Sequence, residues 1–238
     1  MRVIRINRVN SADRDSKLLT TPHRSGKTTW QLILSDLARY RVTDKRSYLT
    51  VLFLCPGAVS GIIYRVGHAL WSYEGPFAPL MWLLRPFYMV VKRINEMLNG
   101  ISIEPRAVIG EGLYVNHGPS IRIAGKCVLG ANCNISHEVT LGPALRDSQR
   151  GAPVLGDRVF VGPGAKLFGG FTVGDDVAIG ANAVVTRSLP DRAVAVGVPA
   201  KVVSRQGSFE FVLYHHMDAD ESRQRSLMLR DSEPPDGV

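Results

Sequence analysis

Aliphatic residues recur at every sixth position over roughly 85 residues in the second half of the chain. The positions are Ile103, Ile109, Val115 and Ile121; after a shift of two, Ile123, Leu129, Ile135 and Leu141; and after a longer break, Leu155, Val161, Leu167, Val173, Ile179 and Val185. This period is typical of a solenoid in which each hexapeptide forms a short strand and a turn. Three hexapeptides complete one triangular coil, and coils stack at the sheet spacing of about 4.8 Å.

Two other positions of the hexapeptide repeat are also restricted. The fifth position holds a small or apolar residue, as in Cys127, Cys133, Val139, Val159, Ala165, Val177 and Ala183. The residue after the aliphatic one is often glycine, as in Gly110, Gly130, Gly142, Gly156, Gly162, Gly174 and Gly180. We expect these glycines to provide a positive φ in the turn. Cys127 and Cys133 are then inward-facing structural thiols and not ligands.

The first half has a different pattern. In "WQLILSDLARY", Trp30, Ile33, Leu34 and Leu37 fall on one face of a helix. Four prolines at positions 56, 76, 79 and 86 are expected to divide the rest into short helices. The predicted fold class is therefore an all-β parallel β-helix preceded by a small α-helical domain.

These patterns divide the chain into four parts. Residues 1–28 are a basic arm expected to be disordered, and residues 29–100 form the α-helical domain. Residues 101–203 form the β-helix, with an extruded loop at 143–153 whose sequence "PALRDSQRGAP" has no period. Residues 204–238 are a tail, and roughly the last 15 residues are expected to be disordered.

The 238 residues carry a formal net charge of +8, much of it within the first 46 positions. A basic arm suits nucleic acid, anionic lipid or an acidic partner. A solvated arm is the favoured interpretation, and no nucleic-acid partner is expected. With no recognisable secretory leader, we expect a cytoplasmic protein, with the inner face of the membrane as an alternative.

Two apolar segments, 49–64 and 77–91, are too short or too interrupted to span a bilayer. Core helices are favoured for both. Peripheral membrane contact through residues 49–91 is the alternative.

Two of the six histidines share a place in the repeat. His117 and His137 are each the third residue of a hexapeptide, and they are separated by one full coil plus the two-residue shift. Both imidazoles are thus expected on the same side of the solenoid. From the residues alone, His117 is either a turn residue or a catalytic base. No third or fourth ligand stands at a matching position, so no metal is expected.

Residues 48–203 resemble the serine acetyltransferase branch of the left-handed hexapeptide-repeat acyltransferases. The resemblance is carried by "LTVLFLCPGAVSGIIYRVGHALW", "GLYVNHGPSIRI", "CNISHEVTLG", the extruded loop and "VAVGVPAKVV". It implies a left-handed coil, a homotrimer, and an active site between neighbouring solenoids. It also implies acetyl-CoA as the co-substrate. His117 would be the general base that takes the proton of an acceptor hydroxyl, and His137 matches a histidine that many members carry, followed here by Glu138.

The departures from the family pattern concern the acceptor. Asn116 and Ser102 stand where the family has aspartates, and Gly151 and Ala152 stand where it has an Arg-His pair. Each missing charged contact weakens binding of a zwitterion by about 2 kcal/mol or more. We therefore predict an acceptor other than serine, most simply a sugar or polysaccharide. Glu104, Glu138 and Asp147 are the remaining candidates to orient a histidine.

The family residues that bind the co-substrate correspond less directly to residues of this chain. Gly142, Ala165 and Ala183 match positions along which the family binds acetyl-CoA through backbone groups. Lys166, Arg187 and Lys201 could face its phosphates or remain solvated. The predicted activity is an acetyl-CoA-dependent O-acetyltransferase on a non-serine alcohol. A serine O-acetyltransferase of cysteine biosynthesis and a non-catalytic solenoid scaffold are the alternatives.

Overall fold

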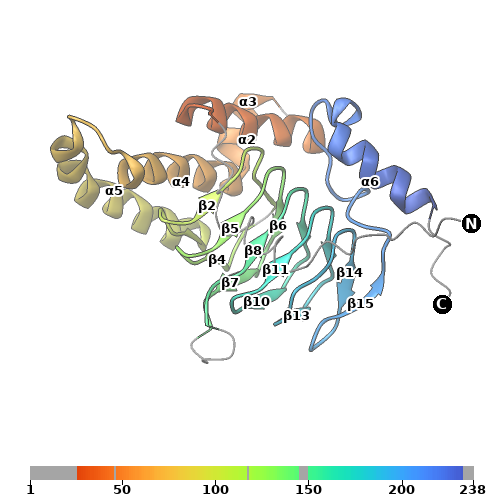
Figure 1. Cartoon of the computed structure of the whole chain (residues 1–238). Coiled ribbons are helices and arrows are strands. Elements are labelled where there is room, and N and C mark those ends of the chain that lie inside the picture. Colours follow the sequence, from red (N-terminus) through yellow and green to blue (C-terminus); the bar gives the residue numbers. More distant parts are fainter. Residues whose placement is uncertain (1–25, 46, 117, 145–149, 233–238) are drawn as a thin grey trace, which may run out of the picture.

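The second half of the chain is a three-sided parallel β-solenoid (Figure 1). The computed structural model describes residues 26–45, 47–116, 118–144 and 150–232. The first sheet is β1 (Ile101–Ile103), β4 (Ile121–Ile123), β7 (Thr140–Gly142), β10 (Lys166–Phe168) and β13 (Val184–Val185). The second is β2 (Val108–Ile109), β5 (Val128–Leu129), β8 (Val154–Leu155) and β11 (Thr172–Val173). The third is β3 (Tyr114–Asn116), β6 (Asn134–Ser136), β9 (Phe160–Val161), β12 (Ala178–Ile179), β14 (Val194–Val196) and β15 (Lys201–Ser204).

The strand register agrees with the hexapeptide pattern. Arg122 pairs with Thr140, one coil of 18 residues away. Ile101 pairs with Ile121, and Thr140 pairs with Lys166. The two-residue shift and the loop at 143–153 are therefore accommodated between strands. Every predicted interior position is buried, including Cys127 and Cys133, which are free thiols. Burial raises the pKa of both thiols to about 12, so neither is a thiolate near neutral pH.

The expected reason for the hexapeptide glycines is wrong. None of the seven has a positive φ. The left-handed corner residues are instead Gly112 and Gly164, which lie outside this set, and the non-glycine residues Asn132, Glu138, Arg158, Asp176, Asn182 and Arg192. All of the hexapeptide glycines except Gly142 are required by stacking on the next coil. A Cβ on Gly130 would lie 2.5 Å from the carbonyl carbon of Gly156 and 2.3 Å from Oδ1 of Asp157 in the next coil.

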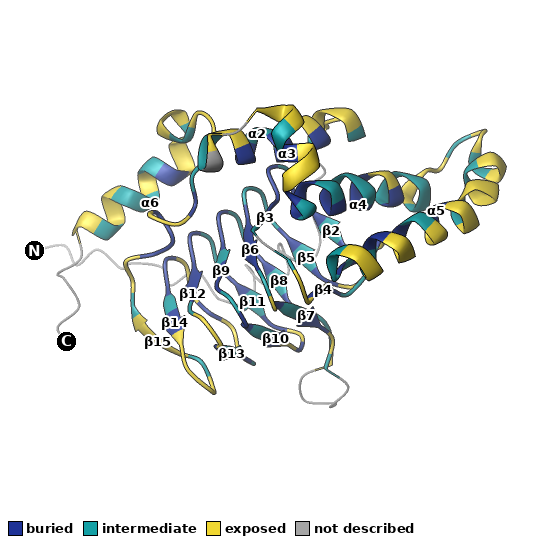
Figure 2. Ribbon diagram, turned by 180° about the vertical axis from the view of Figure 1, so that it is seen from behind, coloured by how far each residue is buried: buried dark blue, intermediate teal, exposed yellow. Residues whose placement is uncertain are grey.

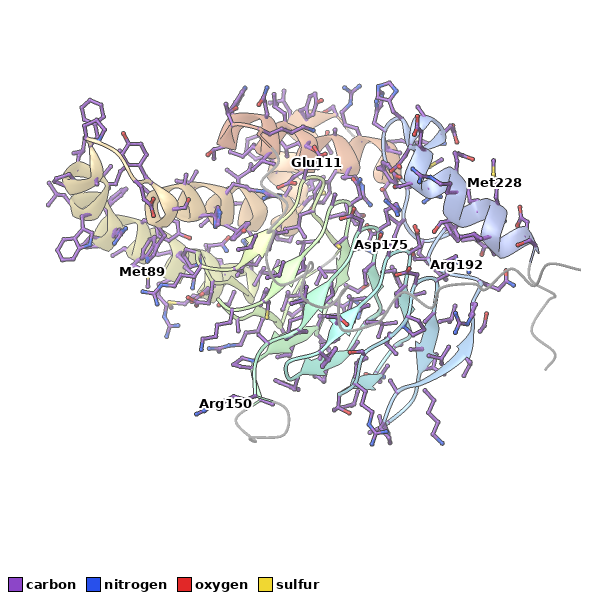
Figure 3. The ribbon with its side chains drawn as sticks, in the orientation of Figure 1. Met89, Glu111, Arg150, Asp175, Arg192 and Met228 are labelled. Atoms are coloured by element: carbon purple, nitrogen blue, oxygen red, sulfur yellow. The ribbon has the colours of Figure 1, made fainter. Side chains whose placement is uncertain are left out.

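A ladder of aspartates runs along this glycine corner. Asp157 Oδ1 accepts the Ala131 N–H at 2.7 Å, Asp175 Oδ1 accepts the Asp157 N–H at 2.7 Å, and Asp191 Oδ1 accepts the Asp175 N–H at 3.0 Å. Figure 3 labels Asp175 within this ladder. Burial, together with the charges of its two neighbours in the ladder, raises the pKa of Asp175 to about 6.

Within residues 26–45 and 47–100, the helices that precede the solenoid are α2 (Thr29–Asp44), α3 (Tyr48–Leu54), α4 (Pro56–Ser72) and α5 (Ala78–Asn99). Thr28 caps α2 through a capping box with Gln31. Pro86 does not end a helix as expected: it lies inside α5, on the exposed side. The predicted apolar face of α2 is also partly wrong. Ile33 and Leu37 are buried, whereas Trp30 and Leu34 are exposed, because Asp36 and Arg39 occupy the inward positions.

The helices close the open edge of the first coil. N–H groups such as those of Val108 and Gly110 donate to carbonyls of the following coil, whereas the Asn132 N–H donates back to Glu111 O of the preceding coil. The first coil has no preceding coil, so the carbonyls on its outer edge have no partner within the solenoid. Side chains of the helices donate hydrogen bonds to these carbonyls. Tyr64 Oη donates to Ala107 O at 2.9 Å, Arg65 donates to Ile109 O and Gly110 O at 2.7 and 2.6 Å, and Arg39 Nη1 donates to Gly112 O at 2.7 Å.

A buried ion pair holds Arg65 in this position. Asp36 accepts two hydrogen bonds from the Arg65 guanidinium, at 2.8 and 3.0 Å, and a third from the Leu113 N–H at 2.8 Å. Both side chains are almost fully buried. Helix α2, helix α4 and the first coil are therefore joined by one polar cluster.

The C-terminal tail folds back on the solenoid and on the side of α2 (Figures 1 and 2). Phe211 stacks on Phe160 with ring centroids 4.7 Å apart. A short 3-10 helix, η2 (Met217–Ala219), leads into α6 (Glu221–Ser232). The expectation of disorder for the last residues is thus wrong up to Ser232, because buried Arg223 donates to the carbonyls of Phe209 and Val212. Residues 233–238 and 1–25 of the expected disordered segments lie outside the described residues.

Replacing a stacked glycine should destabilise the solenoid. In Gly130→Ala the new methyl group meets backbone atoms of the next coil, so we expect the free energy of unfolding in urea to fall by about 1–3 kcal/mol. The matched control is Gly61→Ala in α4, where no atom lies within 4 Å of the added Cβ. That variant should gain about 0.5–1 kcal/mol. Equal stabilities for the two variants would contradict the stacking explanation.

The Asp175 carboxyl should make stability pH-dependent. Its pKa is higher in the folded protein, about 6, than its unfolded value of 3.8, so its protonation stabilises the fold below about pH 4. This contribution is lost as the pH rises through 6. Asp175→Asn keeps an oxygen for the Asp157 N–H but does not titrate. We expect it to gain about 2 kcal/mol over the parent between pH 4 and pH 7, measured by urea unfolding at each pH. Parallel pH profiles would contradict the assigned pKa.

Candidate active site

A cleft of about 500 Å³ lies where helix α5 passes the outer face of β1 and β4. Its charged and polar lining is Lys92, Arg93, Glu96, Ser102, Glu104 and Arg122. Met89 on α5 lies at its rim and is labelled in Figure 3. Because residues alternate across a strand, Ser102 and Glu104 point outward while Ile101 and Ile103 enter the core.

Lys92 connects two carboxylates in this cleft. It is only 6% exposed, and its Nζ donates to Glu96 Oε1 at 2.5 Å and to Glu104 Oε1 at 3.0 Å. Ser102 Oγ also donates to Glu96 Oε1, at 2.6 Å. Burial disfavours the ionised form of Glu96, but these hydrogen bonds and the Lys92 charge lower its pKa below the usual value. Glu96 is therefore an anion held against Ser102.

Arg122 provides a second cation beside this network. It is the register partner of Ser102 on the neighbouring strand, and its side chain is exposed. Glu104 is 42% exposed at its side chain, so it remains accessible although it pairs with Lys92. The cleft thus offers an accessible carboxylate and an accessible guanidinium at its mouth. Because Lys92 donates to Glu104, a lysine positions this carboxylate, which the sequence analysis considered only as a partner for a histidine.

The predicted base, His117, lies outside the described residues, but its surroundings in the sequence are described. Val115 pairs with Ile135 and Asn116 with Ser136, which is the register that the spacing between His117 and His137 predicts. Tyr114 Oη donates to Asn116 Oδ1 at 3.4 Å. Ile121 N donates to Gly100 O at 3.1 Å, so the segment after His117 runs beside the start of β1. The role of His117 stays a prediction.

His137 lies at the corner that follows β6. Its ring is partly exposed, and its carbonyl accepts the Gly164 N–H at 3.0 Å. Glu138 has a φ of 58° and is exposed, and its carbonyl accepts a hydrogen bond from Lys166 Nζ. Lys166 is therefore tied to the neighbouring corner. Among the described residues, no group of three or more His, Cys, Asp or Glu could hold a metal ion.

The predicted co-substrate residues have different settings. Ala165 and Ala183 are fully buried, and their carbonyls accept the N–H groups of Thr140 and Lys166 within the solenoid. Gly142 is buried at the end of β7 beside Phe168. Lys201 is exposed on β15, and Arg187 is exposed after β13. The roles of all five in binding acetyl-CoA stay predictions.

The extruded loop is closed at its base. Ala144 N donates to Gly151 O at 3.0 Å, and Arg150 is labelled at this point in Figure 3. Gly151 has a φ of 134° and Ala152 packs partly against the solenoid core. Asp147, the third carboxylate candidate, lies outside the described residues.

Sequence reasoning missed Lys92, Glu96 and Arg122. Lys92 and Glu96 are spaced by four residues on a helix, which is a common surface pair, so their spacing alone does not indicate a site. Arg122 could have been found, because the solenoid register places it directly beside Ser102.

Comparison with known proteins places these features in a family. The profile for "Bacterial transferase hexapeptide (six repeats)" matches residues 152–187. The serine acetyltransferase of Helicobacter pylori strain J99 is 39% identical over 163 residues, which cover 67% of this chain and 88% of that protein. That of Synechococcus elongatus is 32% identical over 186 residues, covering 78% and 72%.

Solved structures agree with the sequence relatives. Soybean serine acetyltransferase apoenzyme superposes with a TM-score of 0.63 at 29% identity, covering 74% of this chain and 69% of that one. A Neisseria gonorrhoeae serine acetyltransferase in complex with serine gives 0.62 at 27% identity, covering 73% and 68%. The predicted left-handed parallel β-helix with a preceding helical region is thereby confirmed.

The predicted acceptor is wrong. Relatives at 30–39% identity are serine acetyltransferases, and none of those described above is named for a sugar or polysaccharide acceptor. The prediction counted charges lost from the family motifs and did not include the charged residues that α5 and β4 place around Ser102. The scaffold alternative is also set aside, because the relatives indicate an acetyl-transferring acyltransferase.

Proposed function

On the premise that the chain belongs to the serine acetyltransferase family, we propose that it transfers the acetyl group of acetyl-CoA to the hydroxyl of serine. The observation that carries this proposal is the 39% identity to a serine acetyltransferase that the chain matches over 88% of its length. The reaction class, acetyl transfer by an acyltransferase, follows from the same relatives.

The chemistry requires a base and an acyl donor. Serine Oγ attacks the thioester carbonyl carbon while an imidazole takes its proton. A C–O ester bond forms, the C–S bond breaks, and the CoA thiolate leaves and is protonated. Neutral imidazole suits this role near pH 7. We assign the role of base to His117, from its place in the motif "VNHG", and keep His137, one coil away, as the second candidate.

The cleft beneath α5 supports serine as the acceptor in spite of the altered motifs. A zwitterion needs an anionic partner for its ammonium group and a cationic partner for its carboxylate. Glu104 and Arg122 present these charges at the mouth of the cleft, and Lys92 and Glu96 neutralise each other behind them. In our proposal Glu104 binds the ammonium group of serine and Arg122 binds its carboxylate. They replace the charged residues that the family has at the positions of Asn116, Ser102, Gly151 and Ala152.

The co-substrate and the assembly complete the proposal. Acetyl-CoA is the expected donor, with Lys166 and Lys201 as candidates for its phosphates. A homotrimer is the expected assembly, as for hexapeptide-repeat relatives. A neighbouring solenoid would then cover the open side of the cleft.

Removal of the base should abolish turnover. For His117→Ala we expect serine-dependent CoA release to fall by about 10²–10⁴-fold, with little change in the KM for acetyl-CoA. His215→Ala, which removes an exposed histidine on the tail, is the matched control and should retain the parent rate. Release of CoA that does not depend on serine, or full activity in His117→Ala, would overturn the assignment.

Removal of the cleft cation should weaken serine binding. Arg122→Met should raise the KM for serine by about 10-fold or more, because a charged hydrogen bond contributes about 1.5–3 kcal/mol. The KM for acetyl-CoA should not change. Arg225→Met, which removes an exposed arginine on α6, is the matched control. An unchanged KM for serine in Arg122→Met would exclude this residue from the acceptor site.

A further inference from the structure

Helix α5 turns its apolar side outward. Its 22 residues include a row of exposed large apolar side chains. We call this row the α5 outer face, and its members are Trp82, Leu83, Phe87, Val90, Met97 and Leu98. Trp82 is 70% exposed and Phe87 is 71% exposed. Figure 2 shows the exposed colouring along this helix, which projects with α4 beyond the solenoid.

The polar residues of α5 are turned inward because the fold uses them there. Lys92 binds the two carboxylates of the cleft, and Asn95 exchanges hydrogen bonds with Ser60 on α4. Arg85 donates to the Leu70 carbonyl at 3.2 Å, and its guanidinium lies 5.0 Å from the Trp71 ring centroid. The usual amphipathic direction of a surface helix is therefore reversed.

This exposure is energetically unfavourable in water. Burial of one large apolar side chain stabilises a protein by about 1.5–3 kcal/mol, and exposed apolar patches on soluble proteins often mark interaction sites. Beside the outer face, a groove of about 410 Å³ between α4 and α5 is lined only by apolar residues and Tyr88. The α5 outer face is thus suited to an apolar occupant.

We propose that the α5 outer face docks on the surface of an anionic lipid bilayer, with the helix lying in the plane of the headgroups. Three observations favour lipid over a protein partner. The exposed side of α5 carries no acidic residue. Its single exposed charge is Arg93, which also lines the cleft and pairs with the partly buried Glu96 at 3.4 Å. Apart from Tyr88 the groove is lined by aliphatic residues and Phe87, whereas protein interfaces form about one hydrogen bond per 100–200 Å². The chain carries a net charge of +8, much of it within the first 46 residues, so the basic N-terminal segment adds attraction to anionic headgroups.

The membrane contact is peripheral in this proposal. No single helix among the described residues is long and apolar enough to cross a bilayer. Helices α3 and α4 reach the required length and composition only together, and they are bent by 92° where they meet. A helix of 22 residues lying flat extends over about 33 Å of surface. The test of the proposal does not depend on the acceptor, since the two residues that it replaces, Trp82 and Phe87, do not line the cleft.

Vesicle binding tests the proposal. The full chain is sedimented with vesicles of phosphatidylcholine alone and with vesicles that also contain phosphatidylglycerol. We expect binding to the anionic vesicles, weaker binding as salt is added, and little binding to phosphatidylcholine. The double variant Trp82→Glu/Phe87→Glu should lose binding by about 10-fold or more. The control Met228→Glu replaces an equally exposed apolar residue, 70% exposed on α6, and should bind like the parent.

Two further readouts separate lipid from a second copy of the chain. Light scattering should give the same oligomeric mass for the double variant and the parent, and thermal unfolding should give the same midpoint, because both residues are exposed. A lower oligomeric mass in the double variant would show that the face is a subunit interface and would overturn the proposal. Failure of the parent chain to bind anionic vesicles would overturn it as well.

Discussion

The unpaired carbonyls of the first coil are the constraint on which the arrangement of this molecule depends. A solenoid satisfies its backbone by stacking each coil on the next, so the first coil needs partners from elsewhere. Here these partners are side chains from α2, α4 and α5, including two buried arginines. An arginine buried in this way requires compensation, and Asp36 provides it for Arg65. The helical domain is therefore an integral part of the β-helix.

The sequence predicted the solenoid well because its interior imposes a strict period. Each coil has one interior, so every sixth residue must be apolar, and a period of six has no other simple origin. The glycine positions were also predicted, but their cause was not. A local interpretation considers backbone torsion angles, whereas the true reason for Gly130 is contact with Gly156 and Asp157 in the next coil. Such contacts between coils are invisible in a single hexapeptide.

The acceptor was inferred wrongly for a related reason. The motif comparison considered only the aspartates that Ser102 and Asn116 replace. It aligns sequence positions and does not include the residues that lie close to them in the folded chain. The fold brings Lys92 and Glu96 from a helix, and Arg122 from the next coil, to the place where Ser102 stands. A carboxylate hydrogen-bonded to Ser102 lies six residues away in the sequence, on another element. The prediction of His117 as the base depended only on the motif and the repeat, and it stays a prediction.

At the C-terminal end of the solenoid, the open edge is covered in a different way. There β15 turns back and pairs antiparallel with β14, with a shift of register between Val194 and Ala195. A parallel coil from another molecule would need the exposed edge of a parallel strand, and this hairpin replaces it. With helices over one end and a reversed strand over this sheet at the other, the third sheet offers no parallel edge to a second copy. The hairpin thereby works against end-to-end stacking of coils into fibres along this side of the solenoid.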